Sequence, residues 1–134
     1  MHKKDYMIWH NIKTNIDNLN NRAFFHEREI WFCYLGANVG FEQDGSGDEY
    51  LRPILIIKKF NKEIFWGIPL TKSKKSKGKN DMYYYSFSFV KNIISLAILS
   101  QIRLVDAKRL SRQIGTIQEA DFEKLTKKLK DLLP

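Results

Sequence analysis

The feature that most constrains this chain is a series of short apolar runs separated by turn and loop signals. The runs are rich in Ile, Phe, Tyr and Trp, which favour β-strands. Many short strands with tight turns and one terminal helix predict a mainly β, strongly bent antiparallel barrel with flanking helices. The predicted strands are Glu29–Leu35, Pro53–Lys58, Glu63–Leu70, Met82–Phe89, Leu96–Val105 and Arg109–Ile114.

Two of these runs predict strands that are buried on both faces. Glu29–Leu35 and Pro53–Lys58 are apolar without alternation, as in a strand with a core on each side. Pro53 is placed at the first position of its strand, where the missing N–H removes no ladder bond. Asn61 and Lys62 predict a hairpin turn between the second and third strands.

Helices are predicted at both ends of the chain. Ile8, Ile12, Ile16 and Leu19 form one apolar stripe, which predicts a helix from about Asp5 to Asn20. The chain of 134 residues then divides into a helical extension, 1–25, and one barrel domain, 26–134. In the C-terminal helix, a capping box of Thr116 with Glu119 is expected at the start. Its buried stripe is Phe122, Leu125, Leu129 and Leu132.

The net charge of the chain indicates what kind of partner it binds. The chain carries 23 Lys and Arg against 15 Asp and Glu, a net charge of +8, which favours nucleic acid, an acidic protein or a membrane surface as partner. Cys33 stands in an apolar run and is interpreted as a core residue. Because no apolar stretch reaches membrane-spanning length and no secretory signal is evident, a cytoplasmic location is expected.

Polar residues at the ends of predicted strands are the candidates for chemistry. Arg52 precedes one apolar run, Thr71 follows another, and Gln101 with Arg103 interrupts a third. If these strands are neighbours, their polar ends converge at one mouth of the barrel. Alternatively, Arg52 makes an ordinary surface ion pair with Asp48 or Glu49. No spacing of His or Cys predicts a metal site, and no cofactor is expected.

At these positions the sequence resembles the MazF/PemK family of toxins from type II toxin–antitoxin systems. The resemblance runs in order from about Arg28 to the C-terminus, roughly four-fifths of the chain, and leaves out the N-terminal helix. It is carried by Leu35-Gly-Ala-Asn-Val-Gly-Phe-Glu-Gln43, Arg52-Pro-Ile-Leu-Ile-Ile57, Pro69-Leu-Thr71, Leu99-Ser-Gln-Ile-Arg-Leu-Val-Asp106 and Lys108-Arg-Leu110.

The resemblance implies a fold, an activity and partners. It implies an SH3-like barrel that forms a homodimer with an RNA groove at the interface. It also implies sequence-selective, metal-independent cleavage of single-stranded RNA to 2′,3′-cyclic phosphate and 5′-OH ends. A toxin of this kind further implies an acidic antitoxin protein that blocks the cleft. In such enzymes Arg52 and Thr71 would be the catalytic pair, and Gln101 would contact RNA.

Two segments would complete the RNA-binding surface. The glycine-rich segment of about Ala37–Tyr50, with Glu42 and Gln43, would close over the substrate. The basic segment after Thr71 is interpreted as tracking phosphates, although it also fits an ordinary solvated loop. Its candidate RNA-binding residues are Lys72, Lys74, Lys75 and Lys77.

One departure leaves the general base open. Some relatives have a carboxylate directly before the glutamine, where this chain has Ser100. Glu42 or Asp48 could substitute, or the reaction could use the arginine without a carboxylate. Two other functions also remain: a protein-binding poison on the same fold, like the CcdB gyrase inhibitors, and a non-catalytic RNA- or antitoxin-binding module.

Overall fold

The structure is a computed structural model that describes residues 23–35, 51–72 and 82–134. The predicted N-terminal helix and the glycine-rich segment lie outside the described residues, as does the basic segment beyond Lys72.

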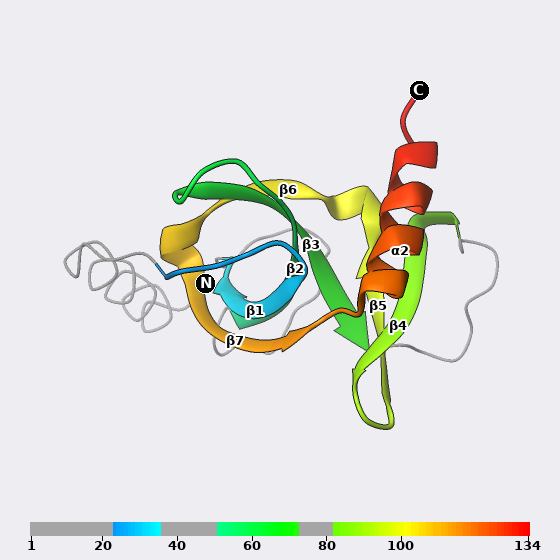
Figure 1. The fold of residues 1–134 in the computed structure, drawn as a ribbon, viewed down its shortest axis with the longest axis horizontal. Helices are drawn as coiled ribbons and strands as arrows, with labels where there is room; N and C mark the ends of the chain where they lie inside the picture. The colour runs from blue at the N-terminus through cyan, green and yellow to red at the C-terminus, as the bar shows by residue number, and fades with distance from the viewer. Residues whose placement is uncertain (1–22, 36–50, 73–81) are drawn as a thin grey trace, which may run out of the picture.

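Within the described residues, seven strands form one curled antiparallel sheet, followed by a C-terminal helix. The strand order is β4-β5-β3-β2-β1-β7, and β6 also pairs with β3. Strands β1, β2, β3, β6 and β7 curl into a half-barrel, while β4, β5 and α2 stand beside it (Figure 1). The mainly β prediction is therefore confirmed. The elements are β1 (Glu29–Tyr34), β2 (Leu51–Lys59), β3 (Ile64–Lys72), β4 (Tyr84–Val90), β5 (Ile93–Ile98), the 3-10 turn η3 (Leu99–Gln101), β6 (Arg103–Asp106), the 3-10 turn η4 (Ala107–Arg109), β7 (Leu110–Thr116) and α2 (Glu119–Asp131).

The β2–β3 hairpin forms at the predicted turn. The Asn61 side-chain oxygen accepts hydrogen bonds from the backbone N–H groups of Glu63 (2.7 Å) and Ile64 (3.0 Å), an Asx turn that reverses the chain. Strand β2 begins two residues before Pro53, which is its third residue rather than its first. Pro53 is the partner of Phe32 on β1, beyond the last β2–β3 pair, Ile54 with Pro69.

Strand β2 is buried on both faces, as its sequence predicted. Ile54 and Ile56 belong to a core within the half-barrel, which we call the barrel core, and Leu55 and Ile57 belong to a second core beneath α2, which we call the helix core. The barrel core consists of Phe25, Trp31, Cys33, Ile54, Ile56, Phe65, Val105, Ala107 and Leu110. The helix core consists of Ile30, Leu55, Ile57, Ile68, Leu70, Phe87, Ala97, Leu99, Ile117 and Leu125.

The expected single strand from Leu96 to Val105 is wrong. β5 pairs with the end of β3 (Ala97 with Leu70), and β6 pairs with its beginning (Arg103 with Gly67). Between these pairs, the five residues 98–102 face only the two residues 68 and 69, so three are in excess. The three residues of η3 take up this excess, and Leu99 is buried in the helix core.

Helix α2 starts without the capping box expected from its sequence. Its N-cap is Gln118, and no side chain caps the helix. Thr116 instead ends β7, and its hydroxyl oxygen accepts a hydrogen bond from Gln113 Nε2 at 3.3 Å. Acidic residues in the first turn and basic residues in the last turn still complement the helix dipole.

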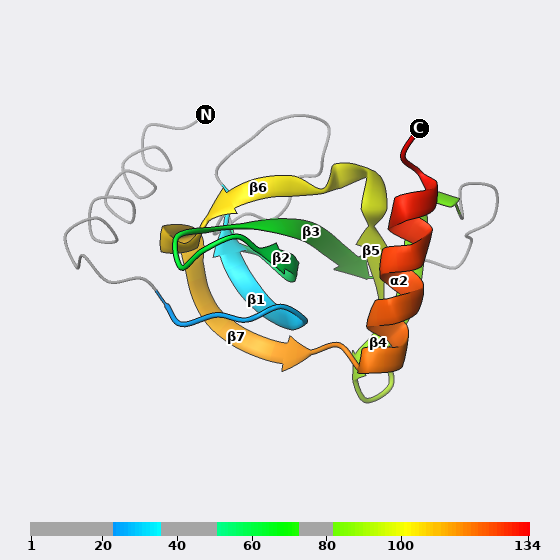
Figure 2. The same cartoon turned by 45° about the horizontal axis from the view of Figure 1, so that its top comes forward.

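The apolar stripe of α2 packs on the helix core as predicted. Leu125 is fully buried, and Phe122, Leu129 and Leu132 pack around it. Two hydrogen bonds fix the helix against β4: Tyr85 Oη donates to Asp121 (2.7 Å), and Lys128 Nζ donates to the Tyr84 carbonyl (2.7 Å). Figure 2 shows the helix lying along β4 and β5, outside the half-barrel.

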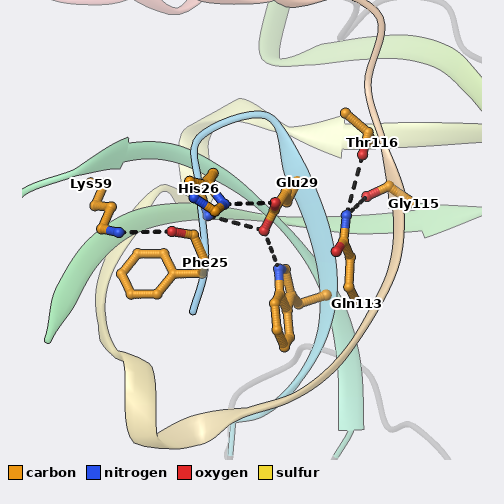
Figure 3. A network of polar contacts seen from close by, with 8 residues as sticks. Phe25, His26, Glu29, Lys59, Gln113, Gly115 and Thr116 are labelled. Atoms are coloured by element: carbon orange, nitrogen blue, oxygen red, sulfur yellow. Dashed lines mark hydrogen bonds and ion pairs between the residues drawn. The ribbon is translucent and has the colours of Figure 1, made fainter. Parts of the chain in front are cut away.

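The segment before β1 is tied to the sheet by polar contacts (Figure 3). The Glu29 carboxylate accepts hydrogen bonds from the His26 backbone N–H (3.0 Å) and from Trp31 Nε1 (2.9 Å). Lys59 Nζ donates to the Phe25 carbonyl at 2.8 Å and lies 4.5 Å from the centre of its ring. Phe25 is consequently held in the barrel core, where it is fully buried.

In the part of the chain that the structure describes, no helix is long and apolar enough to cross a membrane.

Candidate functional site

Arg52 is the second residue of β2 and the cross-strand partner of Cys33 on β1. Because side chains alternate along a strand, Arg52 shares the face of Ile54, which is the face of the barrel core. The arginine is half-buried, and its Nη1 donates to the carbonyl of Leu51 at 3.0 Å. Its guanidinium therefore lies at the mouth of the half-barrel with part of its donor set fixed.

Thr71 is the next-to-last residue of β3 and is exposed. Both Arg52 and Thr71 lie two residues beyond the last β2–β3 pair, Ile54 with Pro69. Directly opposed residues of an antiparallel pair point to the same face, so both positions belong to the barrel-core face at the same end of the hairpin. From there, β3 continues in register with β5, where Thr71 is the partner of Leu96.

Gln101 is the last residue of η3 and is exposed. The excess residues that form η3 stand beside positions 68 and 69 of β3, directly before Thr71. Arg52, Thr71 and Gln101 are thus carried by β2, β3 and η3, of which β2 pairs with β3 and η3 connects the two strands that pair with β3. Ser100 precedes Gln101 and is also exposed.

The remaining predicted RNA contacts are described only in part. Lys72 ends β3, is exposed and is the partner of Ser95 on β5. The other predicted contacts lie outside the described residues: Glu42, Gln43, Lys74, Lys75 and Lys77.

A second arginine at this mouth, Arg109, was not predicted from the sequence. Its Nη1 donates to the carbonyl of Tyr34 at 3.3 Å, and Tyr34 is the cross-strand partner of Leu51, the residue whose carbonyl holds Arg52. The two guanidinium groups are therefore attached to backbone carbonyls of facing residues. In the sequence, the only sign of Arg109 was its place in the Lys108-Arg-Leu110 segment.

Arg103 completes the basic side of the mouth. It is exposed, and it alternates with Val105, a barrel-core residue, so it lies on the same face as Arg52. Burial raises the pKa of the Cys33 thiol to about 12, while the positive charges of Arg109 and Arg103 act in the opposite direction. The field of both arginines thus reaches the barrel core next to Arg52.

This arrangement suits an anionic ligand with several oxygen atoms. A guanidinium offers planar parallel donors and a permanent charge, and a threonine hydroxyl adds a small donor. Among the described residues, no group of three or more His, Cys, Asp or Glu is placed to hold a metal ion.

A sequence model described as the PemK-like, MazF-like toxin of type II toxin–antitoxin systems matches residues 26–133. A comparison with curated protein sequences gives no match.

Solved structures show the same fold at low sequence identity. The Mycobacterium tuberculosis toxin MazF-mt6 gives a TM-score of 0.56 at 16% identity over 78% of this chain and 94% of that protein. A mycobacterial endoribonuclease in complex with its cognate antitoxin gives 0.61 at 14% identity, over 83% and 98% of the two chains. MazF from Deinococcus radiodurans gives 0.61 at 14% identity, over 82% and 96%.

These likenesses agree with the resemblance seen in the sequence. Because the family model covers most of the chain, including every described strand and α2, the chain belongs to the PemK-like, MazF-like family of toxins of type II toxin–antitoxin systems.

Proposed function

We propose that this protein is a sequence-selective endoribonuclease toxin that cleaves single-stranded RNA without a metal ion. The observation that carries the proposal is the placement of Arg52 and Thr71 on one face, each two residues beyond the same cross-strand pair. Family membership supports it, and one solved protein of this fold is itself named an endoribonuclease.

The proposed reaction uses a nucleophile that the substrate already contains. The 2′-OH of the ribose attacks the adjacent phosphorus, the bond to the 5′ oxygen of the next nucleotide breaks, and that oxygen takes up a proton. The products are a 2′,3′-cyclic phosphate and a 5′-OH end. The enzyme has only to align the attack and stabilise charge on the five-coordinate phosphorus.

Each proposed catalytic residue has one role. The Arg52 guanidinium donates two parallel hydrogen bonds to the phosphate oxygens and stabilises their growing charge. The Thr71 hydroxyl donates a further hydrogen bond to the same phosphate. Gln101 positions the RNA beside them, and Lys72 contacts the backbone. Loss of one preorganised donor in comparable oxyanion sites lowers kcat by about 10²–10³.

The residues outside the described ranges keep their predicted roles within this proposal. Glu42 and Gln43 contact RNA, and Lys74, Lys75 and Lys77 follow its phosphates. For single strands, each phosphate neutralised by a lysine steepens the log–log salt dependence of binding by about 0.7. Ser100 is not a general base, so the proton of the 2′-OH goes to Glu42, to Asp48 or to water polarised by Arg52.

Two protein partners belong to the proposal. The protein acts as a homodimer with the RNA groove at its interface. An acidic antitoxin occupies the basic mouth, as charge complementarity favours; a protein of similar fold has been solved with its cognate antitoxin.

The test is cleavage of a long RNA in EDTA, with mapping of the cut sites and analysis of the end groups. We expect cuts at one short sequence with cyclic phosphate and 5′-OH ends. Arg52→Ala is expected to lower kcat at least about a hundredfold. Arg112→Ala serves as the matched control, because Arg112 lies over the ring of Phe32, on the face opposite Cys33.

Three outcomes would contradict the proposal in whole or in part. Undiminished cleavage by a folded Arg52→Ala protein would remove Arg52 from the chemistry. RNA binding without cleavage of any sequence would point to a non-catalytic module, and gyrase inhibition without RNA cleavage would point to a CcdB-like poison.

A further inference from the structure

Three large apolar side chains lie next to one another on the outer surface of the half-barrel. Trp66 on β3 and Leu104 on β6 are direct cross-strand partners, and both are exposed. The ring of Phe60 packs edge-on against the ring of Trp66, with 5.0 Å between the ring centres, and is also exposed. We call Phe60, Trp66 and Leu104 the outer patch. A contiguous exposed apolar surface of this kind marks a site of interaction.

The outer patch is separate from the proposed catalytic mouth. Phe65 is buried in the barrel core, and side chains alternate along a strand, so Trp66 points to the opposite face of β3. Thr71 lies on the barrel-core face, near the other end of the same strand. The outer patch therefore has no part in the proposed cleavage reaction.

The segment before β1 runs beside the outer patch. Lys59 Nζ donates to the Phe25 carbonyl at 2.8 Å (Figure 3), and the centres of the Phe25 and Phe65 rings are 5.1 Å apart. Lys59 directly precedes Phe60, and Phe65 directly precedes Trp66. Phe25 is thus in contact with the neighbours of two residues of the outer patch.

The chain before Phe25 carries an apolar stripe that fits such a surface. The sequence of residues 1–22 predicts a helix with Ile8, Ile12, Ile16 and Leu19 on one side. At a rise of 1.5 Å per residue this stripe is about 16 Å long, enough to cross the roughly 10 Å from β2 over β3 to β6. An isolated helix of this length is only marginally stable in water, so packing on an apolar surface has to stabilise it.

We infer that residues 1–22 form an amphipathic helix whose apolar stripe packs on the outer patch of the same chain. The segment ends three positions before Phe25, and so short a tether gives it an effective concentration in about the millimolar range. Docking within one chain is therefore favoured over docking of the segment from a second copy. The helix covers the outer patch and lies on the face away from Thr71.

The first test measures hydrogen–deuterium exchange of the full chain by mass spectrometry, in peptides that cover residues 8–19. Leu104→Asp places a charge in the outer patch. Ile94→Asp on β5 is the matched control, because Leu104 and Ile94 are similarly exposed, at 57% and 54%. Docked amides exchange slowly, so we expect Leu104→Asp to accelerate exchange at least about tenfold, whereas Ile94→Asp should not. Thermal unfolding establishes that both variants are folded.

The second test changes the segment instead of the patch. Ile12→Asp places a charge in the apolar stripe, whereas Thr14→Asp places it on roughly the opposite side, since successive residues are about 100° apart around a helix. Ile12→Asp should accelerate exchange as Leu104→Asp does, and Thr14→Asp should not. Combining Ile12→Asp with Leu104→Asp should add little to either change alone, because both remove the same contact.

A cross-linking experiment identifies the copy that supplies the helix. Ile12→Cys is combined with Leu104→Cys, or with Ile94→Cys as the control, and each protein is treated with a short bismaleimide. The native Cys33 is fully buried and does not compete for the reagent. On a denaturing gel, we expect a link within one chain for the pair with Leu104→Cys and no link for the control pair.

The outcomes decide the inference without reference to RNA cleavage. Equal exchange of residues 8–19 in Leu104→Asp and Ile94→Asp would overturn it, whether both match the wild type or both exceed it. Links between two chains would show that a second copy occupies the outer patch, and would overturn docking within one chain. Leu104→Asp is expected to keep any ribonuclease activity of the wild type, so failure of the proposed function leaves these tests unaffected.

Discussion

Arg28 and Ile117 are bonded to each other twice across 89 residues of sequence. The backbone N–H of Ile117 donates to the Arg28 carbonyl at 3.0 Å, and Arg28 Nη2 donates to the Ile117 carbonyl at 3.0 Å. Arg28 also has a φ of 79°, a left-handed conformation that L side chains rarely adopt. The pair therefore holds the segment before β1 against the segment that leads into α2.

The first prediction concerns this pair. Arg28→Ala removes the side-chain bond, leaves the Ile117 carbonyl without this donor and keeps the strained backbone, so it should destabilise the protein by about 1–3 kcal/mol. Arg28→Gly removes the same bond but relieves the strain, and should be about 1 kcal/mol more stable than Arg28→Ala. Urea unfolding measures the difference. Equal stability of the two variants would show that the left-handed conformation is not a source of strain.

The second prediction concerns the close approach between β2 and β3. A Cβ atom on Gly67 would lie 2.6 Å from Ile54 Cδ1 and 2.8 Å from Ile54 Cγ1. Since both side chains would belong to a packed core, Gly67→Ala should cost about 1–3 kcal/mol.

A matched test removes Ile54 Cδ1, the atom that would lie nearest to a Cβ on residue 67. Ile54→Val deletes Cδ1 and should alone cost about 0.5–1.5 kcal/mol. In the double variant, part of the Gly67→Ala cost should disappear, giving a favourable coupling energy in a double-mutant cycle. Strictly additive free energies of unfolding would refute the predicted contact.

The third prediction concerns alkaline pH. Partial burial, and then the hydrogen bond to Asp121 and its negative charge, raise the pKa of Tyr85 to about 12 from an ordinary value of 10. Because the folded state holds this proton more tightly than the unfolded state, the contribution of Tyr85 to stability is complete below pH 10 and is lost as the pH rises to about 12. Between pH 10 and about 12, the thermal unfolding temperature of the wild type should fall more steeply than that of Tyr85→Phe. Parallel curves for the two proteins would exclude the predicted linkage.

The fourth prediction concerns acid pH. Partial burial raises the pKa of Glu29, but hydrogen bonds from Trp31 and His26, together with the charge of His26, outweigh it and give a net lowering from 4.5. The stability that Glu29 contributes is therefore present above its unfolded pKa and is lost as the pH falls below about 4.5. Glu29→Gln should flatten the acid limb of the stability profile, whereas Glu123→Gln, an exposed change on α2, should not. An acid limb that is unchanged in Glu29→Gln would contradict the assignment.

The sequence predicted those features that local patterns encode. The doubly buried β2, the Asn61 turn and the stripe of α2 follow from apolar periodicity and turn chemistry, and all three are confirmed. Arg52, Thr71 and Gln101 could be singled out because each interrupts or ends an apolar run.

Features that depend on pairing between distant strands could not be predicted. Ser100, Gln101 and Arg103 interrupt the apolar run of residues 96–105, but no Gly or Pro there indicates a turn. The turn η3 exists because β3 receives two separate partners in different register. The predicted capping box does not form, because Thr116 is the last residue of β7. Arg109 reaches Tyr34 only through the pairing of β1 with β7, across 75 positions.

The double burial of β2 has a consequence for how the chain selects its alignment during folding. In a strand with one apolar face and one solvent-exposed face, a shift of the pairing by one residue is strongly unfavourable, because it moves every side chain to the opposite face. The central residues of β2 are apolar on both faces, so the hydrophobic pattern specifies the register of this strand only weakly. The sizes of the packed side chains must then distinguish the correct register from a shifted one. Gly67 leaves room for the Ile54 side chain, which a larger residue at position 67 would not. A slip of one residue would put Leu51 or Pro53 where Arg52 now stands, so the close approach of Ile54 to Gly67 also helps to place the guanidinium at the mouth.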